Sequence, residues 1–311
     1  MRIVFMGTPA AAVPTLARVI DDGHEVVAVY TQPDKPAGRG NKVSPSPVKT
    51  FAVEKGIEVF QPVKIRTPEA LEVFHSHAAD VAVVVAYGRI LPEPFLTAFP
   101  MGAVNVHFSL LPKYRGAAPV NWAIVNGEAR TGVTTMKMDA GLDTGDILLR
   151  KATEIGETET APELMARLAV VGAELLSRTL REFKSIAPEP QNVAEATLAP
   201  ILRKSDGLID WSMDARSIAD RVRGFQPFPG TFSILRGVGV KIWKAAAADG
   251  AAGRAGEVLA ASGDELKVAC GNGSVLSIEE LQPEGKKRMK ARDFINGLRP
   301  VVGERFGGEN N

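Results

Sequence analysis

The sequence predicts an α/β protein with a Rossmann-like, mostly parallel sheet in its first half, followed by a small C-terminal OB-like β-barrel domain. Apolar runs alternate with helix-like stretches in the first half, and the run from residue 81 to residue 86 is too apolar to have one face in water. Residues 185–200 carry several prolines and little periodicity, as linkers do. Beyond Trp211, short alternating segments separated by Gly and Asn indicate a small β domain.

Five strands are predicted in the first half because each covers an apolar run between turn or helix signals. They lie at residues 2–6, 25–30, 57–60, 79–86 and 103–107. Helices are predicted at residues 9–21, 68–77, 92–98 and 161–184. Thr8 is expected to cap the first helix, with Pro9 in its first turn. Ligands of such sheets bind beyond the carboxyl ends of the strands, so we expect the functional site there.

The domain boundaries follow from the same changes of pattern. We expect a first domain over residues 1–186, a linker over residues 187–204 and a β domain over residues 205–311. In the β domain, alternating segments at residues 239–244, 256–259, 265–270 and 275–281 predict short strands.

The composition is that of an ordinary globular protein, with 45% apolar residues and a net charge of +1 from 37 basic and 36 acidic side chains. No apolar run approaches the roughly 20 residues that a membrane span needs. A protein that coats nucleic acid would be far more basic, so contact with nucleic acid would need local patches. The one cysteine, Cys270, cannot form an internal disulfide, which favours a reducing compartment, and we expect a cytoplasmic protein.

A long loop rich in Pro, Gly and basic residues is predicted from Thr31 to Lys49. Loops of this length in compact domains are usually functional or disordered. Taken alone, these residues indicate either a binding loop or a surface excursion.

Two other segments carry side chains suited to chemistry. Asn105 and His107 lie two residues apart on the fifth predicted strand, so they point to the same face at the end where ligands bind. Two polar residues at a strand end can equally be satisfied by the backbone. Residues 138–146 form a loop with three acids and two glycines, which is compatible with a plain turn, a cation site or a catalytic acid loop.

Three motifs in order make the sequence recognisable: Asn-Val-His at residues 105–107, Ser-Leu-Leu-Pro at 109–112 and Gly-Leu-Asp-Thr-Gly at 141–145. Together they resemble the folate-dependent formyltransferase family. From Met1 to about Pro300 the chain resembles those members that formylate methionine on initiator tRNA. The resemblance implies direct transfer from 10-formyltetrahydrofolate to an amine, without a covalent enzyme intermediate or a metal, by a protein expected to be a monomer.

The resemblance also implies roles for particular side chains. Asn105 would donate its amide hydrogens to the formyl oxygen, which gains negative charge as the amine attacks. His107 would donate to the same oxyanion or take a proton from the attacking nitrogen, and Asp143 would orient the imidazole and relay the proton. Any of the three can be the group that moves the proton. The positions expected to shape the folate site are Ser109, Leu110, Leu111, Pro112, Ala86, Tyr87, Gly88, Ile90, Leu91 and Asp139.

Basic residues in two places match the regions with which these relatives grip tRNA. The expected tRNA-binding residues are Lys35, Arg39, Lys42 and Lys49 in the long loop, and Lys286, Lys287, Arg288 and Lys290 in the β domain. Without the resemblance, the second run reads more simply as a solvated face. Arg115 is expected to support the cleft, to contact substrate or to form a structural salt bridge.

Phe108 and the pair Ala10-Ala11 depart from the family pattern, and Phe108 adds bulk beside the strand end that carries His107. The residues disfavour three rival functions. A nicotinamide-dependent oxidoreductase is disfavoured because the turn after the first strand, Gly-Thr-Pro-Ala, lacks the G-x-G-x-x-G pattern. A tRNA-binding module without catalysis is disfavoured by the intact motifs. A formyltransferase for a ribonucleotide or an amino-sugar nucleotide is disfavoured by the basic loop and the appended β domain.

Overall fold

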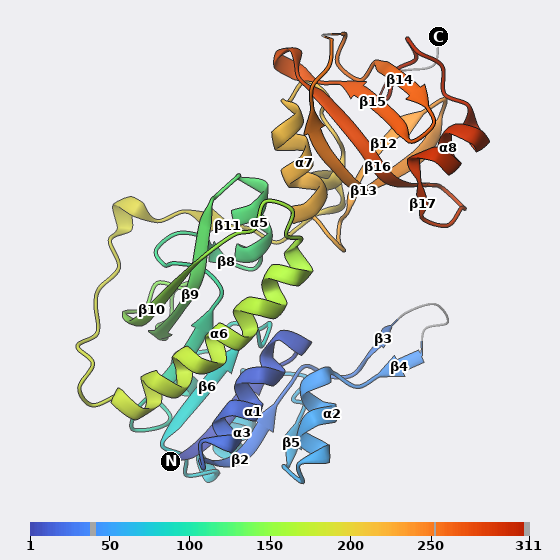
Figure 1. The fold of residues 1–311 in the computed structure, drawn as a ribbon. Coiled ribbons are helices and arrows are strands. Elements are labelled where there is room, and N and C mark those ends of the chain that lie inside the picture. Colours follow the sequence, from blue (N-terminus) through green and yellow to red (C-terminus); the bar gives the residue numbers. More distant parts are fainter. Residues whose placement is uncertain (38–41, 252, 308–311) are drawn as a thin grey trace. The chain divides into compact units, whose positions relative to one another are not determined.

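The computed structural model describes residues 1–37, 42–251 and 253–307, which form two compact units (Figure 1). Unit 1 consists of Met1–Pro119, Arg130–Glu154 and Met165–Ala199. Unit 2 consists of Val120–Ala129, Ile155–Leu164 and the chain from Pro200 onward. Residues 187–199, which were expected to belong to a linker, therefore lie in unit 1. Among the described residues, no helix is long and apolar enough to cross a membrane.

Unit 1 is built on a seven-stranded sheet with the order β10-β9-β7-β6-β1-β2-β5. The five predicted strands are confirmed and pair in parallel. They are β1 (Arg2–Gly7), β2 (Glu25–Tyr30), β5 (Val59–Phe60), β6 (Val81–Val85) and β7 (Ala103–His107). Since β1 and β6 lie in the middle of this sheet, their side chains are buried on both faces, as the uninterrupted apolar runs predict.

Two further strands, β9 (Arg130–Lys137) and β10 (Ile147–Glu154), extend the sheet beyond β7 in antiparallel pairing and were not predicted. Strand β9 lacks the apolar run of a buried strand because several of its buried residues are threonines. Their hydroxyls find partners that are distant in the chain. Thr135 bonds to Thr179 across 2.8 Å, and Thr134 donates to the Ser109 carbonyl across 2.7 Å. Such partners satisfy buried hydroxyls but leave no local pattern.

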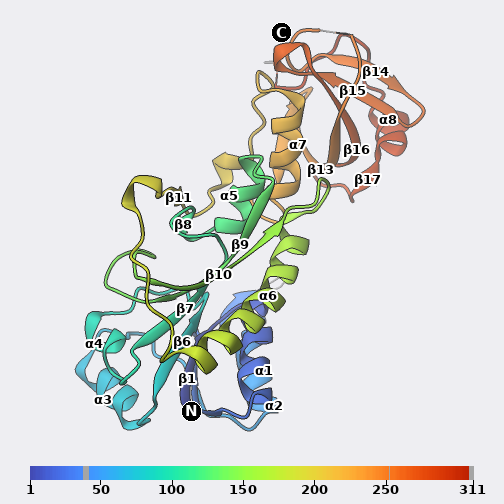
Figure 2. The ribbon, with the colours of Figure 1, turned by 60° about the vertical axis from the view of Figure 1, so that its left-hand side comes forward.

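Helices cover both faces of this sheet (Figure 2). On one face lie α3 (Pro68–Ser76) and α4 (Glu93–Leu96), whose Phe74 and Phe95 pack in one apolar cluster with Val4 and Met6 of β1. On the other face lie α1 (Val13–Asp21) and α6 (Ala161–Glu182), the latter belonging to unit 1 from residue 165. The helices predicted around residues 68–77, 92–98 and 161–184 are thus confirmed.

The first predicted helix is shorter than expected. A 3₁₀ turn, η1 (Ala10–Ala12), precedes α1, and its N-cap is Pro9 without a side-chain bond. The prediction that Thr8 caps this helix is wrong, because the Thr8 hydroxyl donates instead to the Tyr87 carbonyl across 3.0 Å. A contact between the ends of β1 and β6 therefore replaces a local cap.

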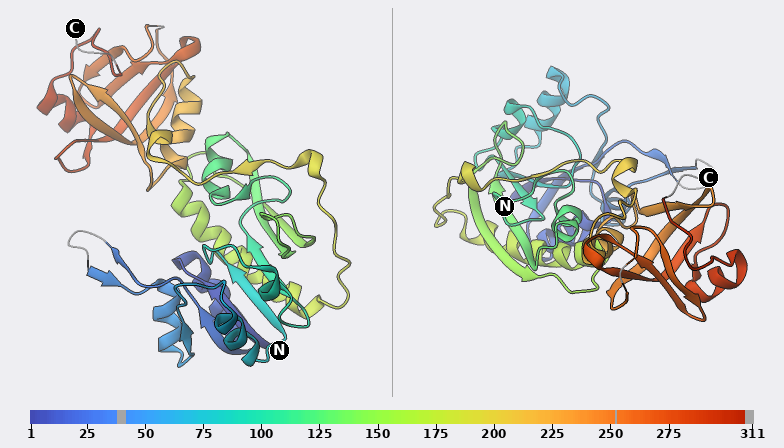
Figure 3. Two further views of the ribbon diagram at one scale, coloured as in Figure 1. Left: turned by 180° about the vertical axis from the view of Figure 1, so that it is seen from behind. Right: turned by 90° about the horizontal axis from the view of Figure 1, so that it is seen from above.

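The segment from Thr31 to Lys49 is not a continuous loop. Strands β3 (Lys35–Ala37) and β4 (Lys42–Ser44) pair antiparallel, with Lys35 opposite Ser44 and Ala37 opposite Lys42. Helix α2 (Pro47–Glu54) begins inside the segment, with the Ser46 side chain accepting from the Lys49 backbone N–H. Figure 3 shows the two strands extending away from the main sheet.

After α6 the chain returns along unit 1 as an extended segment, residues 185–199, that we call the strap. Near its start, Glu189 and Ile147 exchange two backbone hydrogen bonds of 2.8 and 2.9 Å. Its end forms β11 (Leu198–Ala199), which pairs in parallel with the short strand β8 (Arg115–Gly116). The strap is therefore anchored at both ends on the part of unit 1 that carries the three motifs read from the sequence.

Unit 2 contains a six-stranded antiparallel sheet ordered β12-β13-β16-β15-β14, with β17 added beside β16. The strands are β12 (Thr231–Leu235), β13 (Val238–Ala248), β14 (Val258–Ser262), β15 (Glu265–Ala269), β16 (Val275–Pro283) and β17 (Met289–Lys290). Helices α7 (Ala215–Gly224) and α8 (Ala291–Leu298) contribute Ile218 and Phe294 to its core around Trp211. The small β domain is confirmed, whereas its two longer helices and α5 (Pro119–Val125) were not predicted.

Candidate active site

Asn105 and His107 lie on the last residues of β7 and are almost buried, with 8% and 5% of their surface exposed. The Nε2 atom of His107 lies 2.9 Å from the carbonyl oxygen of Tyr114. A carbonyl can only accept, so Nε2 carries a proton and donates it, which leaves Nδ1 as the nitrogen able to gain or lose one. Within the described part of the chain, the Asn105 side chain makes no hydrogen bond, so its amide is available to a ligand.

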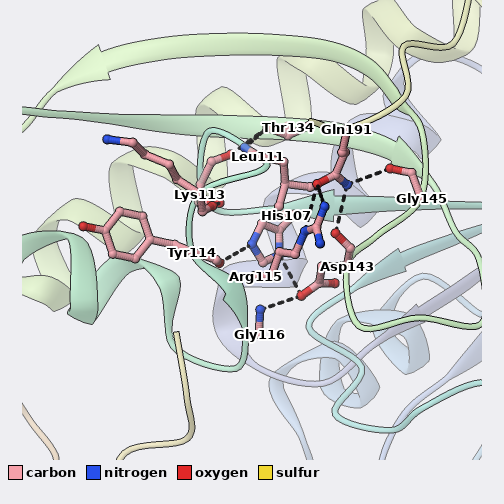
Figure 4. Close-up of polar contacts among 11 residues, drawn as sticks. His107, Leu111, Lys113, Tyr114, Arg115, Gly116, Thr134, Asp143, Gly145 and Gln191 are labelled. Atoms are coloured by element: carbon pink, nitrogen blue, oxygen red, sulfur yellow. Dashed lines mark hydrogen bonds and ion pairs between the residues drawn. The ribbon is translucent and has the colours of Figure 1, made fainter. Parts of the chain in front are cut away.

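Asp143 faces the other nitrogen of this imidazole (Figure 4). Its Oδ2 lies 3.6 Å from Nδ1 of His107 and accepts a 2.8 Å hydrogen bond from the backbone N–H of Gly116. At 3.6 Å the two atoms are beyond hydrogen-bond distance, yet the carboxylate is close enough to stabilise an imidazolium. The structure thus brings the imidazole and the carboxylate together as the resemblance implies.

The backbone around these side chains is strained. Asp143, Tyr114 and Ala86 are non-glycine residues in the left-handed region, with φ values of 52°, 60° and 46°. Such conformations cost free energy and tend to occur at functional sites, where the surrounding structure enforces them. Two residues after Asp143, a Cβ on Gly145 would lie 1.8 Å from the Lys137 carbonyl oxygen, so only glycine fits there.

The motif at residues 109–112 builds the turn that leads away from β7. Ser109 is fully buried, and its hydroxyl donates to the Lys113 carbonyl across 2.6 Å. The Leu111 N–H donates to the hydroxyl of Thr134 on β9 across 3.1 Å. These bonds make the motif a rigid support for Tyr114, and its contact with folate stays a prediction.

Phe108 does not fill the space beside His107. It is buried, and its ring lies against Gly172 of α6. The bulk that departs from the family pattern is thus packed into the core of unit 1.

The tract that follows β6 alternates in exposure. Ala86, Gly88 and Ile90 are exposed, whereas Tyr87 and Leu91 are buried. Ile90 has 64% of its surface exposed, so this tract presents an apolar side chain to solvent. Asp139, also predicted to line the folate site, accepts from the Gly141 N–H and the Thr144 hydroxyl and so closes the loop that carries Asp143.

A basic cavity adjoins this tract and was missed in the sequence. It has a volume of about 400 Å³ and is lined by Lys64, Ile65, Arg66, Thr67, Arg89 and Ile90. The Arg89 guanidinium is held in place because it donates to the Gln32 side chain and to the carbonyls of Pro62 and Val63. The sequence does not predict this cavity, because its cations come from residues 64–66 and from Arg89, which are distant in the chain and meet only in the folded protein.

Comparison with known proteins identifies the family. A model described as "Formyl transferase" matches residues 1–180, and one described as "Formyl transferase, C-terminal domain" matches residues 201–299. The chain belongs to the formyl transferase family. The resemblance read from the three sequence motifs is therefore confirmed.

Individual members of the formyl transferase family match almost the whole chain. The methionyl-tRNA formyltransferase of Solibacter usitatus is 51% identical over 316 residues, covering 99% of this chain and 99% of that protein. The methionyl-tRNA formyltransferase of Geotalea daltonii is 50% identical over 309 residues, covering 99% and 98%. A solved N-formyltransferase from Helicobacter canadensis, in complex with folinic acid and dTDP-3-aminofucose, has a TM-score of 0.67 at 20% identity, over 89% of this chain and 98% of that one. This last likeness shows the shared fold.

The predicted tRNA-binding residues of the first region occupy different environments. Lys35 and Lys42 lie on the paired backbones of β3 and β4, and Arg39 lies outside the described residues. Lys49 is half-buried at the base of this hairpin, where its Nζ donates to Asp34 across 2.5 Å and to Gln61 across 2.7 Å. The Lys49 ammonium therefore anchors the hairpin in this formyl transferase.

In unit 2 the predicted basic run covers the connection from β16 to β17, and its last member, Lys290, is the second residue of β17. Lys286, Lys287 and Lys290 are exposed, and in the residues that the structure covers their ammonium groups have no acidic partner. Arg288 differs because it pairs with Glu280, and its guanidinium carbon lies 5.1 Å from the centre of the Trp243 ring. Three of the four residues are thus free to meet an anion.

Arg115 is buried, and within the described residues its guanidinium pairs with an amide and forms no salt bridge. Its Nε and one terminal nitrogen donate to Oε1 of Gln191, across 3.0 and 2.8 Å. Sequence reasoning missed Gln191 because the strap was taken for an interdomain linker.

Proposed function

We propose that the chain transfers the formyl group of 10-formyltetrahydrofolate to the amino group of methionine on initiator tRNA, giving N-formylmethionyl-tRNA. The observation that carries the proposal is the arrangement of Asn105, His107 and Asp143 at the end of β7, in a chain that is 51% identical to a methionyl-tRNA formyltransferase over almost its full length. The family identifies the reaction class, and these side chains supply the groups that the reaction needs.

In the proposed reaction the amino nitrogen attacks the formyl carbon, and the carbonyl oxygen becomes an oxyanion. The free Asn105 amide donates to this oxygen and stabilises its charge, a type of interaction worth about 2.7–4 kcal/mol in a buried site. Nδ1 of His107 takes the proton that the amine loses, because Nε2 is committed to the Tyr114 carbonyl. The Asp143 carboxylate stabilises the imidazolium. The bond from the formyl carbon to N10 of the folate then breaks, and the proton passes to N10.

The folate donor fits the tract at residues 86–91 and the cavity beside it. A pterin ring needs apolar walls with a few polar atoms, and the exposed side chain of Ile90 offers such a wall. The glutamate end of a folate carries carboxylates, and Lys64 and Arg66 line the adjoining cavity with Arg89. A cofactor that is apolar at one end and anionic at the other suits this surface.

The tRNA acceptor fits the basic elements of each unit. The β3–β4 hairpin carries Lys35 and Lys42 on an element that extends from unit 1, and unit 2 presents Lys286, Lys287 and Lys290 without acidic partners among its described residues. Lysines on exposed turns contact phosphates, which gives affinity without reading the sequence. A nucleotide-sized acceptor needs neither element.

A substrate competition tests the proposal. The protein is given 10-formyltetrahydrofolate labelled in the formyl group, together with methionylated initiator tRNA, methionylated elongator tRNA, glycinamide ribonucleotide or a dTDP-amino sugar. We expect label to pass to the initiator tRNA at least about tenfold faster than to either small acceptor, because the small acceptors lack the phosphate contacts that align the amine. The elongator tRNA shows whether transfer is restricted to the initiator. Faster transfer to one of the small acceptors, or none to tRNA, would refute the assignment.

A further inference from the structure

Gln191 joins the strap to the two segments that hold the proposed catalytic side chains (Figure 4). Its Nε2 donates to the backbone carbonyls of Asp143 and Gly145, across 2.9 and 2.7 Å. Its Oε1 accepts both bonds from the Arg115 guanidinium. One side chain thus bridges the loop that carries Asp143 and strand β8.

These four bonds use both amide hydrogens and both lone pairs of the carboxamide oxygen. The pattern also determines the orientation of the amide, since only the oxygen can accept from a guanidinium and only the nitrogen can donate to carbonyls. No hydrogen-bonding capacity is left for a substrate. A direct role of Gln191 in binding or chemistry is therefore disfavoured.

The strap holds Gln191 in place from both sides. Two residues before it, Glu189 exchanges two backbone hydrogen bonds with Ile147, the first residue of β10. Six residues after it, the Thr197 carbonyl accepts from the Arg115 N–H, and the Thr197 hydroxyl accepts from the Tyr114 N–H, each across 2.9 Å. These hydrogen bonds hold the backbone on both sides of Gln191 against unit 1.

The two bridged segments converge on the imidazole of His107. On one side, Asp143 has a left-handed backbone, with φ 52°, and Gln191 holds its carbonyl in that conformation. On the other side, Arg115 lies between Tyr114, whose carbonyl accepts from Nε2 of His107, and Gly116, whose N–H donates to Oδ2 of Asp143. A loss of the bridge would let the carboxylate and its partners move relative to the imidazole.

We propose that Gln191 is a positioning residue for formyl transfer, which acts by holding Asp143 against His107 and Gly116. This inference rests on the proposed function, because it takes Asp143 to work with His107 in the reaction. It also assigns to the strap, which in the sequence resembles a spacer, a part in building the active site.

A double-mutant cycle on the full-length protein tests the inference. The variants are Gln191→Leu, which removes all four bonds at similar volume, Asp143→Asn, and both together. We expect Gln191→Leu to lower kcat by about tenfold to 100-fold while KM for each substrate changes little, since small misplacements of catalytic groups have effects of this size. The double variant should be about as slow as Asp143→Asn alone, because both changes act through one group. Losses that multiply, or a Gln191→Leu effect confined to KM, would overturn the proposal.

Two further variants separate positioning from folding. Gln191→Glu keeps an acceptor for Arg115 but removes the donors to Asp143 and Gly145, so we expect a loss of kcat close to that of Gln191→Leu with a higher melting temperature. Full activity of Gln191→Glu would show that the donors are not needed. Asn192→Ala, at the exposed neighbouring position, serves as the control and should keep wild-type kcat.

Hydrogen exchange gives a reading that does not depend on activity. In Gln191→Leu the backbone amides of residues 143–146 should exchange faster than in the wild type, while those of β1 and β6 should not change. If the wild-type protein transfers no formyl group, the proposed function fails and the role of Gln191 in formyl transfer fails with it, but this measurement still decides whether Gln191 holds the loop that carries Asp143. Unchanged exchange in residues 143–146 would overturn it.

Discussion

The Nδ1 atom of His107 lies 3.6 Å from Oδ2 of Asp143, while Nε2 of the same ring donates to the Tyr114 carbonyl across 2.9 Å. The second contact places a proton on Nε2, and the carboxylate lies beside the other ring nitrogen, Nδ1. Because Oδ2 also accepts from the Gly116 N–H, the carboxylate is held at this position instead of rotating into solvent.

Asp143→Asn removes the charge beside Nδ1 but keeps an oxygen for the Gly116 N–H. We expect kcat to fall by at least about 100-fold, equivalent to about 3 kcal/mol of transition-state stabilisation, with KM for folate little changed. Steady-state formylation of initiator methionyl-tRNA measures both constants. Asp146→Asn changes an exposed acid of the same loop and should keep wild-type kcat. Near-native turnover of Asp143→Asn would remove Asp143 from the mechanism.

Lys49→Met removes the ammonium that joins Asp34 to Gln61 at the base of the β3–β4 hairpin. The Asp34 carboxylate then loses its cation, so we expect the hairpin to become more mobile. A hydrogen bond to a charged group contributes about 1.5 kcal/mol, and the loss of this free energy from the tRNA-binding conformation would raise KM for tRNA by about tenfold. KM for folate should change far less. Lys55→Met, at the exposed end of α2, is the matched control, and an equal rise in both KM values for Lys49→Met would contradict this role.

The double change Lys286→Gln and Lys287→Gln tests the exposed cations between β16 and β17. We expect weaker tRNA binding and a smaller dependence of log Kd on log salt, with the slope reduced by about 1 for each lysine that binds a phosphate in the wild type. Folate binding should not change. Lys151→Gln combined with Lys184→Gln removes the same charge from exposed positions of unit 1 and should leave the salt dependence as it is. The same slope in all three proteins would exclude Lys286 and Lys287 from the tRNA surface.

Asp214 caps α7, and its pKa is lowered because the backbone N–H and hydroxyl of Ser217 donate to its carboxylate. A carboxyl with a lowered pKa stabilises the fold above the ordinary aspartate pKa, and this stabilisation is lost as the pH falls through the lowered value. Asp214→Ala should therefore lower the free energy of unfolding by about 1 kcal/mol at pH 7. At a pH below the lowered pKa of Asp214, the substitution should lower it by less.

Urea unfolding of unit 2 at neutral and acidic pH measures this difference. Asp249→Ala, at an exposed position of the same unit, is the control and should follow the wild type at every pH. A cost for Asp214→Ala that stays constant down to pH values below the lowered pKa would show that the charge is not the stabilising feature.

The sequence by itself determined the parallel half of the sheet, the small β domain and the identity of the chemical groups. Buried parallel strands are continuous apolar runs, so β1, β6 and β7 are visible locally, and strand alternation places Asn105 and His107 on one face. The order of the motifs at residues 105–145 is enough to indicate the family.

Only the tertiary structure decided how those groups are held. The threonines of β9, the Lys49 anchor and the Gln191 bridge depend on partners that lie 12 to 76 residues away in the chain. A buried polar group needs a hydrogen-bond partner, but any suitable donor or acceptor can fill that place. The local sequence therefore does not indicate which distant residue is the partner. For this reason a segment with the composition of a linker can bridge strand β8 and the loop that carries Asp143.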